Sequence, residues 1–507
     1  MARKRRPKVC IVGLDGVSWS FLTKAFETGL MPFLKATVSS NRCSCYRLES
    51  TFPPYTPPAW TSLFTGVNPG KHGIFSFHVV SKMKSKFNVK LATSLDVEFP
   101  RIFEVLSVIG YNTFVVNVPL TYPLIKELHK RCFVISDWAS PFIDTNLTRY
   151  RKDVLRIFTD YSKLEAWSEQ HDLREYLTAL VDNLYERILL LYELIHNLNW
   201  DLFCVVFSEI DWIQHRIPAL QHGRGFNLIG SLIWLIDRFI QKLGETADLI
   251  LIVSDHGFSR YHISVGINNI LLQLGVLKLR DNKSVTRIHG SKLTFRMKQL
   301  LTRHELNTYY LGSLHRIISK LTAHQESYSE NIDYARSLAF MLENSTFGIY
   351  CAPHIKDKLI TVLKRFCFIK RIVSPAEIYQ GSFVSRAPDI ILVPKEGVWC
   401  SNSVNKVVTY DHVDHAPEGV FIALGDYVIR SKYNQREIPQ TSILNVAPSL
   451  LKLYGIRISP LHDGSALPSF EHYYRGENIK TNYVETYRMA KRIAIIRKQL
   501  LHKTPST

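Results

Sequence analysis

The sequence predicts an α/β protein with a mainly parallel central sheet. Three observations predict it: short apolar runs recur along the chain, segments with helical periodicity lie between them, and several runs end at Asp or His. The chain has 507 residues, 46% of them hydrophobic, so it can bury a large core in one domain with insertions or in two to three domains.

Apolar runs predict the strands. In chain order they are KVCIVGLDG from Lys8, NTFVVNVP from Asn112, CFVIS from Cys132, DLFCVVFSEID from Asp201, DLILIVSDHG from Asp248, PDIILVP from Pro388 and GVFIALG from Gly419. The first of these is typical of a buried parallel strand that feeds a loop.

Three segments between these runs carry the apolar spacing of helices. They are PRIFEVLSVIG from Pro100, REYLTALVDNLYERILLLYELIHN from Arg174 and IGSLIWLIDRFIQKLGE from Ile229. Because strands alternate with helices, the pattern favours a parallel sheet with helical crossovers.

Two segments interrupt this rhythm. We predict a catalytic core over 1–280 and 326–470, a basic insertion over 281–325 that could act as a cap, and a basic helical extension over 471–507. The last helix places Met489, Ile493, Ile496 and Leu500 on one face, with basic residues elsewhere. Docking of this face on the body or on another subunit is one interpretation; contact with nucleic acid or an anionic membrane is the other.

The composition favours an anionic partner and a reducing compartment. The formal charge of +19 suits an anionic substrate, a nucleic acid or an acidic membrane surface. The eight cysteines form no CxxC pair and are predicted to be free, mostly buried thiols. Asp15 ends the first apolar run too early for a signal peptide, and no apolar stretch approaches the ~20 residues of a membrane span. A cytoplasmic, soluble protein is therefore expected.

Acidic residues and histidines gather at the predicted strand ends, where ligand sites of α/β sheets form. Asp211 and His215 lie four residues apart, so a helical turn would place both on one face. Asp255 and His256 follow an apolar run, although they could simply close the strand. Asp15 also lies at the end of a predicted strand, and capping of the helix that follows is its alternative role. His415 precedes another predicted strand, and His412 is the alternative ligand there. Together the set suits two divalent cations, and zinc fits best.

Thr56 lies between prolines in TFPPYTPPAWTSLFTG, Thr51 to Gly66. With Pro57 at the first helical position, we predict Thr56 at the N-cap of a helix. An ordinary capping role is the alternative, but the positive end of the helix also favours an anion.

An ordered series of motifs resembles the alkaline phosphatase superfamily, in its branch of type I phosphodiesterases and nucleotide pyrophosphatases, and within it the predicted phosphohydrolase/phosphomutase group. The matching passages include VGLDGVSWSFL, PPYTPPAWTSLFTGVNPGKHGIFSF, FSEIDWIQH, VSDHGF and HAPEGVFIALG, and the series extends to about residue 465. The resemblance implies a mostly parallel sheet flanked by helices on both faces, with metals at its carboxyl edge.

By position, the resemblance implies one metal held by Asp15, Thr56, Asp255 and His256, and a second held by Asp211, His215 and His415. Thr56 would be the nucleophile and would carry a covalent phosphoryl group. The implied cofactors are two divalent ions, Zn²⁺ or else Mn²⁺, and the implied substrate is a phosphorylated small molecule.

Several positions depart from the family pattern or bear on the substrate. Ala59 stands three residues after Thr56, where nucleotide pyrophosphatases of this superfamily carry an asparagine. Tyr55 could shape a pocket for the leaving group, and Lys71 and His72 could meet phosphate or stabilise a turn. The sequence shows no Cys-x-Pro-x-Arg sulfatase signature.

We therefore predict a two-metal phosphodiesterase or nucleotide pyrophosphatase. A phosphomonoesterase or phosphomutase is the alternative within the superfamily. A polyanion-binding protein without turnover is the alternative from another class, and its basic insertion and C-terminal helix would make the contact.

Overall fold

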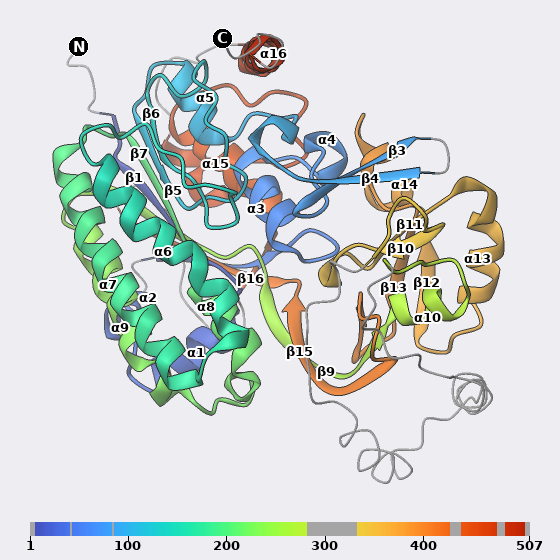
Figure 1. Cartoon of the computed structure of the whole chain (residues 1–507). Helices are drawn as coiled ribbons and strands as arrows, with labels where there is room; N and C mark the ends of the chain where they lie inside the picture. The colour runs from blue at the N-terminus through green and yellow to red at the C-terminus, as the bar shows by residue number, and fades with distance from the viewer. Residues whose placement is uncertain are drawn as a thin grey trace.

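The computed structural model describes residues 6–40, 43–83, 86–280, 332–425, 438–473 and 482–501. The predicted insertion over 281–325 lies outside these described residues. A large body with the main sheet lies beside a smaller lobe built mainly from the second half of the chain (Figure 1).

An eight-stranded sheet forms the centre of the body. Its order is β17-β2-β16-β8-β1-β7-β5-β6. The strands are β1 (Val9–Leu14), β2 (Cys43–Glu49), β5 (Thr113–Val116), β6 (Cys132–Ile135), β7 (Leu202–Phe207), β8 (Leu249–Val253), β16 (Glu418–Gly425) and β17 (Gln440–Ser442). Only β16 among these runs antiparallel to its neighbours, so the predicted mostly parallel sheet is confirmed.

Helices cover both faces of this sheet (Figure 1). On one face lie α1 (Trp19–Glu27), α2 (Pro32–Ser39), α6 (Arg151–Gln170), α7 (Leu173–Asn197), α8 (Glu209–Arg216) and α9 (Gly230–Leu243). On the other lie α3 (Thr56–Thr65), α5 (Ile102–Val108) and α15 (Val446–Leu453). In β1, Cys10 and Val12 join the first core cluster, while Val9 and Ile11 join the second. This alternation explains why the strand is apolar throughout.

The smaller lobe has a sheet of its own. Its order is β10-β11-β13-β12, from Ala339–Met341, Gly348–Cys351, Ile390–Pro394 and Ile369–Val373, and all its pairs are antiparallel. Helices α10 (Ile267–Gln273), α13 (Lys356–Leu363) and α14 (Pro375–Ile378) accompany it. The chain also forms a three-stranded sheet of β14 (Val398–Ser401), β9 (Gly257–Gly266) and β15 (Val408–Ala416). It further contains a hairpin of β3 (His78–Met83) and β4 (Lys86–Leu91) and the short helix α4 (Pro69–His72).

The predicted run PDIILVP forms β13 and therefore joins the smaller sheet instead of the main one. An apolar run indicates burial but carries no information about its partner strand, so its sheet could not be read from the pattern. The other six predicted runs supply β1, β5, β6, β7, β8 and β16 of the main sheet.

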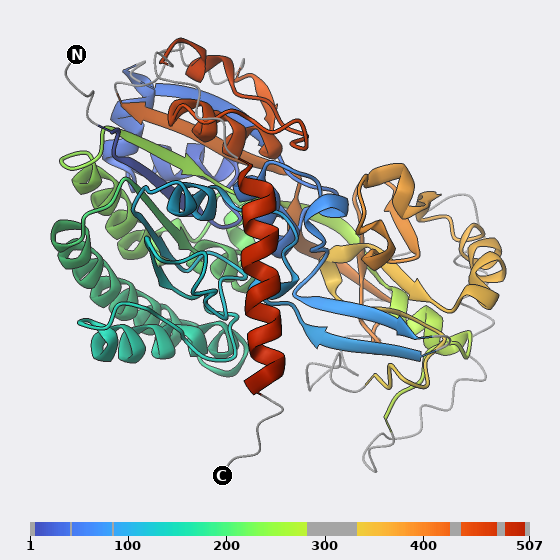
Figure 2. The same ribbon diagram turned by 90° about the horizontal axis from the view of Figure 1, so that it is seen from above.

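The C-terminal helix α16 (Tyr483–Leu501) lies along the outside of the body (Figure 2). Within the described residues, no helix has the length and apolar character needed to cross a bilayer. All eight cysteines lie in described segments, none forms a disulfide, and seven are buried.

Candidate metal centre at the carboxyl edge of the main sheet

The structure brings the predicted acidic residues and histidines together. Asp15 follows β1, Asp211 and His215 lie on α8 just after β7, and the pair Asp255 and His256 follows β8. These three strands are adjacent and parallel, so their carboxyl ends meet at one edge of the sheet.

His415 arrives from a different element than predicted. We expected a loop before a strand, but His415 lies within β15, whose antiparallel pairing with β9 places it opposite Phe258. Since β9 begins directly after His256, this pairing carries His415 back to the sheet edge. The rings of His256 and His415 stack with centroids 3.9 Å apart.

One group of candidate ligands contains Asp211, His215 and His415. The Nε2 atom of His415 lies 3.3 Å from Asp211 Oδ1 and 3.1 Å from Nε2 of His215. One ligand atom from each of the three residues lies within 4.8 Å of the other two, a spacing that suits a common cation.

A second group contains Asp15, Asp211 and His256, again with ligand atoms within 4.8 Å of one another. His256 Nε2 lies 3.7 Å from Asp15 Oδ1 and 3.2 Å from Asp255 Oδ2. Asp211 therefore belongs to both groups, whereas the sequence interpretation placed it with His215 and His415 alone.

Thr56 faces this centre. Its Oγ1 lies 3.2 Å from Nε2 of His256, and the residue is 5% exposed. The prediction that Thr56 is the N-cap is off by one residue: Tyr55 takes that position, without a side-chain cap bond, and Thr56 is the first residue of α3. The hydroxyl therefore points to His256 at the positive end of a ten-residue helix.

Backbone carbonyls orient two of the histidines. Nδ1 of His415 lies 3.2 Å from the carbonyl of Pro54, and Nδ1 of His256 lies 3.2 Å from the carbonyl of Gly257. Because a carbonyl only accepts, each Nδ1 carries a proton in these contacts, which leaves Nε2 toward the other groups of the centre. This is the usual arrangement around metal-binding histidines.

The pKa values of the three aspartates shift in different directions. Burial, followed by the charges of Asp255 and Asp211, raises the pKa of Asp15 well above its ordinary value. Burial also raises the pKa of Asp255 to about 7. The pKa of Asp211 is lowered in spite of burial, because His215 and His415 face it.

Several oxygen atoms in this centre accept no hydrogen bond. Asp15 Oδ1, Asp211 Oδ1 and Asp255 Oδ2 are buried and accept no hydrogen bond within the described structure. Buried, unpartnered carboxylates are costly, and a divalent cation would relieve both their repulsion and their desolvation. The residues present therefore fit a metal centre.

Lys71, His72 and His412 have other partners. The Lys71 ammonium donates to the carbonyl of Leu461 at 2.8 Å and forms an ion pair with Asp463, which supports the turn-stabilising alternative. His72 is buried against Ser62, with 2.9 Å between Nε2 and Oγ, and His412 Nε2 lies 2.9 Å from Asp414. His415, and not its rival, thus joins the centre.

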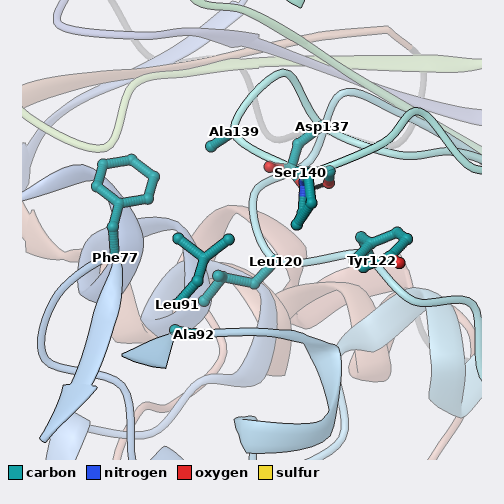
Figure 3. A pocket seen from close by; sticks show the side chains of 9 residues that line it. Phe77, Leu91, Ala92, Leu120, Tyr122, Asp137, Ala139 and Ser140 are labelled. Carbon is teal, nitrogen blue, oxygen red and sulfur yellow. Dashed lines mark hydrogen bonds between the residues drawn. The ribbon is translucent and has the colours of Figure 1, made fainter. Parts of the chain in front are cut away.

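Aromatic side chains surround Tyr55, the residue before Thr56. The Tyr55 ring packs edge-on against Phe77, with centroids 5.6 Å apart, and Phe77 packs in the same manner against Trp138. Figure 3 shows Phe77 at a cavity of about 10 Å³, which has room for one water at most. This cavity is too small for a leaving group.

The sequence interpretation missed Glu343. Its carboxylate lies 2.5 Å from Nδ1 of His78 and accepts a hydrogen bond from the backbone N–H of Phe77. Burial, followed by the charge of Glu343, raises the pKa of Tyr55. Glu343 comes from the smaller lobe, far along the chain, and nothing in its local sequence signals this contact.

Ala59 is fully buried in the core cluster that also contains Trp60 and Phe64. The structure therefore gives this position a packing role on α3.

Solved structures of low sequence identity share the fold. Murine ectonucleotide pyrophosphatase/phosphodiesterase 5 is 13% identical, with a TM-score of 0.54 over 90% of this chain and 97% of its own. The human protein of the same name is 15% identical, with a TM-score of 0.53 over the same shares. Phosphonoacetate hydrolase from Sinorhizobium meliloti is 14% identical, with a TM-score of 0.50 over 96% of each chain.

No curated protein matches the chain. A family model described as type I phosphodiesterase/nucleotide pyrophosphatase matches residues 9–418, which include all seven candidate metal ligands. The chain therefore belongs to the type I phosphodiesterase/nucleotide pyrophosphatase family.

Proposed function

We propose that the protein is a two-metal phosphoric ester hydrolase that cleaves phosphodiesters or nucleotide pyrophosphates through Thr56. One observation carries the proposal: three histidines and buried carboxylates, each with an oxygen that accepts no hydrogen bond, converge beside the Thr56 hydroxyl. Family membership supports the reaction class.

In this proposal one cation is held by Asp15, Thr56, Asp255 and His256, and the second by Asp211, His215 and His415. Asp211 also reaches the first group. Nitrogen and carboxylate ligands suit Zn²⁺, with Mn²⁺ as the alternative. When bound, the two cations would lower the pKa of the attacking hydroxyl and neutralise charge on the leaving oxygen.

Thr56 performs the covalent step. Its Oγ1 attacks phosphorus and forms an O–P bond, while the ester oxygen departs with the electron pair of its P–O bond and takes up, through solvent, the proton that the hydroxyl gives up. The phosphoryl group on Thr56 keeps its second ester substituent. One water then attacks its phosphorus, the Oγ1–P bond breaks, a proton of the water returns to Oγ1, and the phosphomonoester is released. The N-terminus of α3 favours negative charge at this position, and the helix fixes the hydroxyl for in-line attack.

The leaving group would lie on the side of Tyr55. The half-buried ring of Tyr55 contacts Phe77, and its centroid lies 6.1 Å from the centroid of the His415 ring. An organic group that entered there would therefore meet an aromatic surface. A threonine-to-alanine variant of murine ectonucleotide pyrophosphatase/phosphodiesterase 5 is described as inactive and in complex with AMP. This supports both a catalytic threonine and a nucleotide-like substrate.

The test compares a bis-aryl phosphodiester with an aryl phosphomonoester, each with Zn²⁺ and with Mn²⁺. We expect faster turnover of the diester. Thr56→Ala should lower kcat at least about a thousandfold with metal content retained, whereas Thr56→Ser should keep measurable turnover.

Thr61→Ala is the matched control, because Thr61 is a buried threonine of the same helix whose hydroxyl only donates to the carbonyl of Pro57. It should leave kcat within a few-fold of the parent protein. Turnover of the monoester alone would establish the phosphomonoesterase or phosphomutase instead. If the metal-loaded protein cleaved neither ester, the hydrolase proposal would be wrong.

A further inference from the structure

The C-terminal helix docks on the body with a different face than its sequence predicts. We expected Met489, Ile493, Ile496 and Leu500 to form the docking face if the helix packed on the body. Instead, Tyr483, Val484, Tyr487 and Lys491 are buried. The Tyr487 hydroxyl and the Lys491 ammonium each donate to the carbonyl of Val97 at 2.8 Å, and Lys491 also pairs with Glu98.

These polar contacts explain the choice of face. A buried lysine needs a partner, and Glu98 together with a carbonyl supplies it. The small side chains of Ala490 and Ala494 complete the contact against a cluster that contains Ile125 and Leu128. The helix is therefore held without use of its larger apolar residues.

The opposite face carries an exposed apolar stripe. Met489 is 66% exposed, Ile493 45% and Ile496 55%. Their spacing of four and three residues places them on one line along the helix. Large aliphatic side chains left in water on successive turns mark an interaction surface.

Cationic side chains border this stripe. At 100° per residue, Arg488 and Arg492 lie along one edge and Arg497 along the other, and all three are exposed. Arg488 pairs with Glu485 at 3.4 Å and Arg497 with Glu127 at 2.6 Å, so these two would exchange carboxylates for lipid phosphates. Glu485 is the only acidic residue of the helix.

We propose that the stripe of Met489, Ile493 and Ile496 rests in the surface of an anionic membrane, with Arg488, Arg492 and Arg497 against the lipid headgroups. The helix lies flat along the body (Figure 2), as an interfacial helix must. Aliphatic side chains enter the acyl boundary, while arginines extend to phosphates at its edge. This surface contact is independent of the proposed hydrolase activity.

The other occupants fit the stripe less well. A nucleic acid would use the arginines but would leave three aliphatic side chains without a partner. A second copy docked through the same stripe would bring two rows of arginines together with a single acidic residue on each helix. An anionic bilayer satisfies both parts of the surface.

The test is co-sedimentation of the full chain with vesicles of phosphatidylcholine alone or of equal parts phosphatidylcholine and phosphatidylglycerol. We expect binding to the anionic vesicles only, weakened by high salt. The triple variant Met489→Ser, Ile493→Ser, Ile496→Ser should weaken binding at least about tenfold. Arg492→Ala should weaken it about fivefold and reduce the salt dependence.

The matched control is the double variant Tyr185→Ser, Leu189→Ser. These side chains on α7 are 52% and 50% exposed, so the control removes equally exposed apolar surface from another helix. It should bind vesicles as the parent protein does, and all variants should hydrolyse a soluble aryl ester at the parent rate.

Three outcomes would overturn the proposal. They are equal binding of both vesicle types, vesicle binding that the triple variant does not reduce, and a parent dimer that the triple variant makes monomeric while neither binds vesicles. The last outcome, read by light scattering, would assign the stripe to a second copy.

Discussion

Asp211 is the side chain that joins the two ligand groups. Its carboxylate lies within reach of His215 and His415 on one side and of Asp15 and His256 on the other. Its surroundings also set it apart chemically: its pKa is lowered, while burial raises the pKa of Asp15 and Asp255.

We predict that Asp211→Asn lowers metal content at both positions, because the amide removes a charge that both groups use. His215→Ala should lower it at one position only. Mass spectrometric metal analysis after gel filtration measures both. If Asp211→Asn lost no more metal than His215→Ala, Asp211 would serve a single position.

His72 gives a prediction about pH. Burial lowers the pKa of His72 from 6.5 to about 3. Between these two pH values, His72 is protonated in the unfolded chain but neutral in the folded protein. The stability contributed by neutral His72 is therefore complete above pH 6.5 and is lost as the pH falls toward 3. The slope is about 1.4 kcal/mol per pH unit.

Urea unfolding of the parent and of His72→Gln between about pH 6 and pH 4 measures this effect. As the pH falls, we expect the free energy of unfolding of the parent to decrease more steeply than that of His72→Gln, and the two slopes should differ by about this amount. The other histidines contribute equally to both proteins. Parallel curves would show that His72 is protonated in the folded protein.

At the scale of elements, a buried ion pair positions the helix that carries Asp211 and His215. Arg187 on α7 and Glu209, the first residue of α8, form this pair, and their side chains are 1% and 0% exposed. Arg187 also donates to Asn183 and stacks over the ring of Tyr161. The ion pair therefore holds the first residue of α8 against α7.

We predict that Glu209→Gln destabilises the protein by about 3 kcal/mol, because it leaves the guanidinium buried without a countercharge. Metal affinity should fall with it, since α8 begins at this residue. Glu186→Gln is the matched control: it breaks the exposed pair with Arg156, whose side chains are 48% and 57% exposed, and should cost less than about 1 kcal/mol. Equal losses in urea unfolding would contradict this.

The elements themselves were largely predictable. Apolar runs with Asp or His at their ends correctly marked β1, β7 and β8, because parallel strands gather their carboxyl ends at one edge. The N-cap of α3 was misplaced by one residue, since Thr and Tyr both tolerate the extended backbone of that position. The sequence could not assign β13 to the smaller sheet, because burial patterns do not name partner strands.

At the scale of the whole molecule, the candidate metal centre lies at the ends of strands from the middle of the main sheet. Burial, together with the charges of neighbouring carboxylates, raises the pKa of Asp15 and Asp255, so the ionised forms of these two side chains oppose folding when no cation is present. Bound metal should therefore contribute to global stability as well as to turnover.

We predict that saturating Zn²⁺ raises the free energy of unfolding of the parent by about 2 to 4 kcal/mol. Asp15→Asn should be at least as stable as the parent without metal, because it removes a carboxyl group whose ionisation is opposed by burial and by neighbouring carboxylates, and should gain less from Zn²⁺. Thermal unfolding with and without a chelator measures this. A metal-free Asp15→Asn protein less stable than the metal-free parent would contradict it.

By itself, the sequence determined the fold class, the family resemblance and the residue types of the centre. These depend on local periodicity and on short motifs at strand ends. The tertiary structure alone decided that Asp211 reaches both ligand groups, that Glu343 of the smaller lobe accepts a hydrogen bond from Phe77, which packs on Tyr55, and which face of α16 docks on the body. The physical reason is sequence separation: His215 and His415 are 200 residues apart, and such contacts depend on packing that no local pattern records.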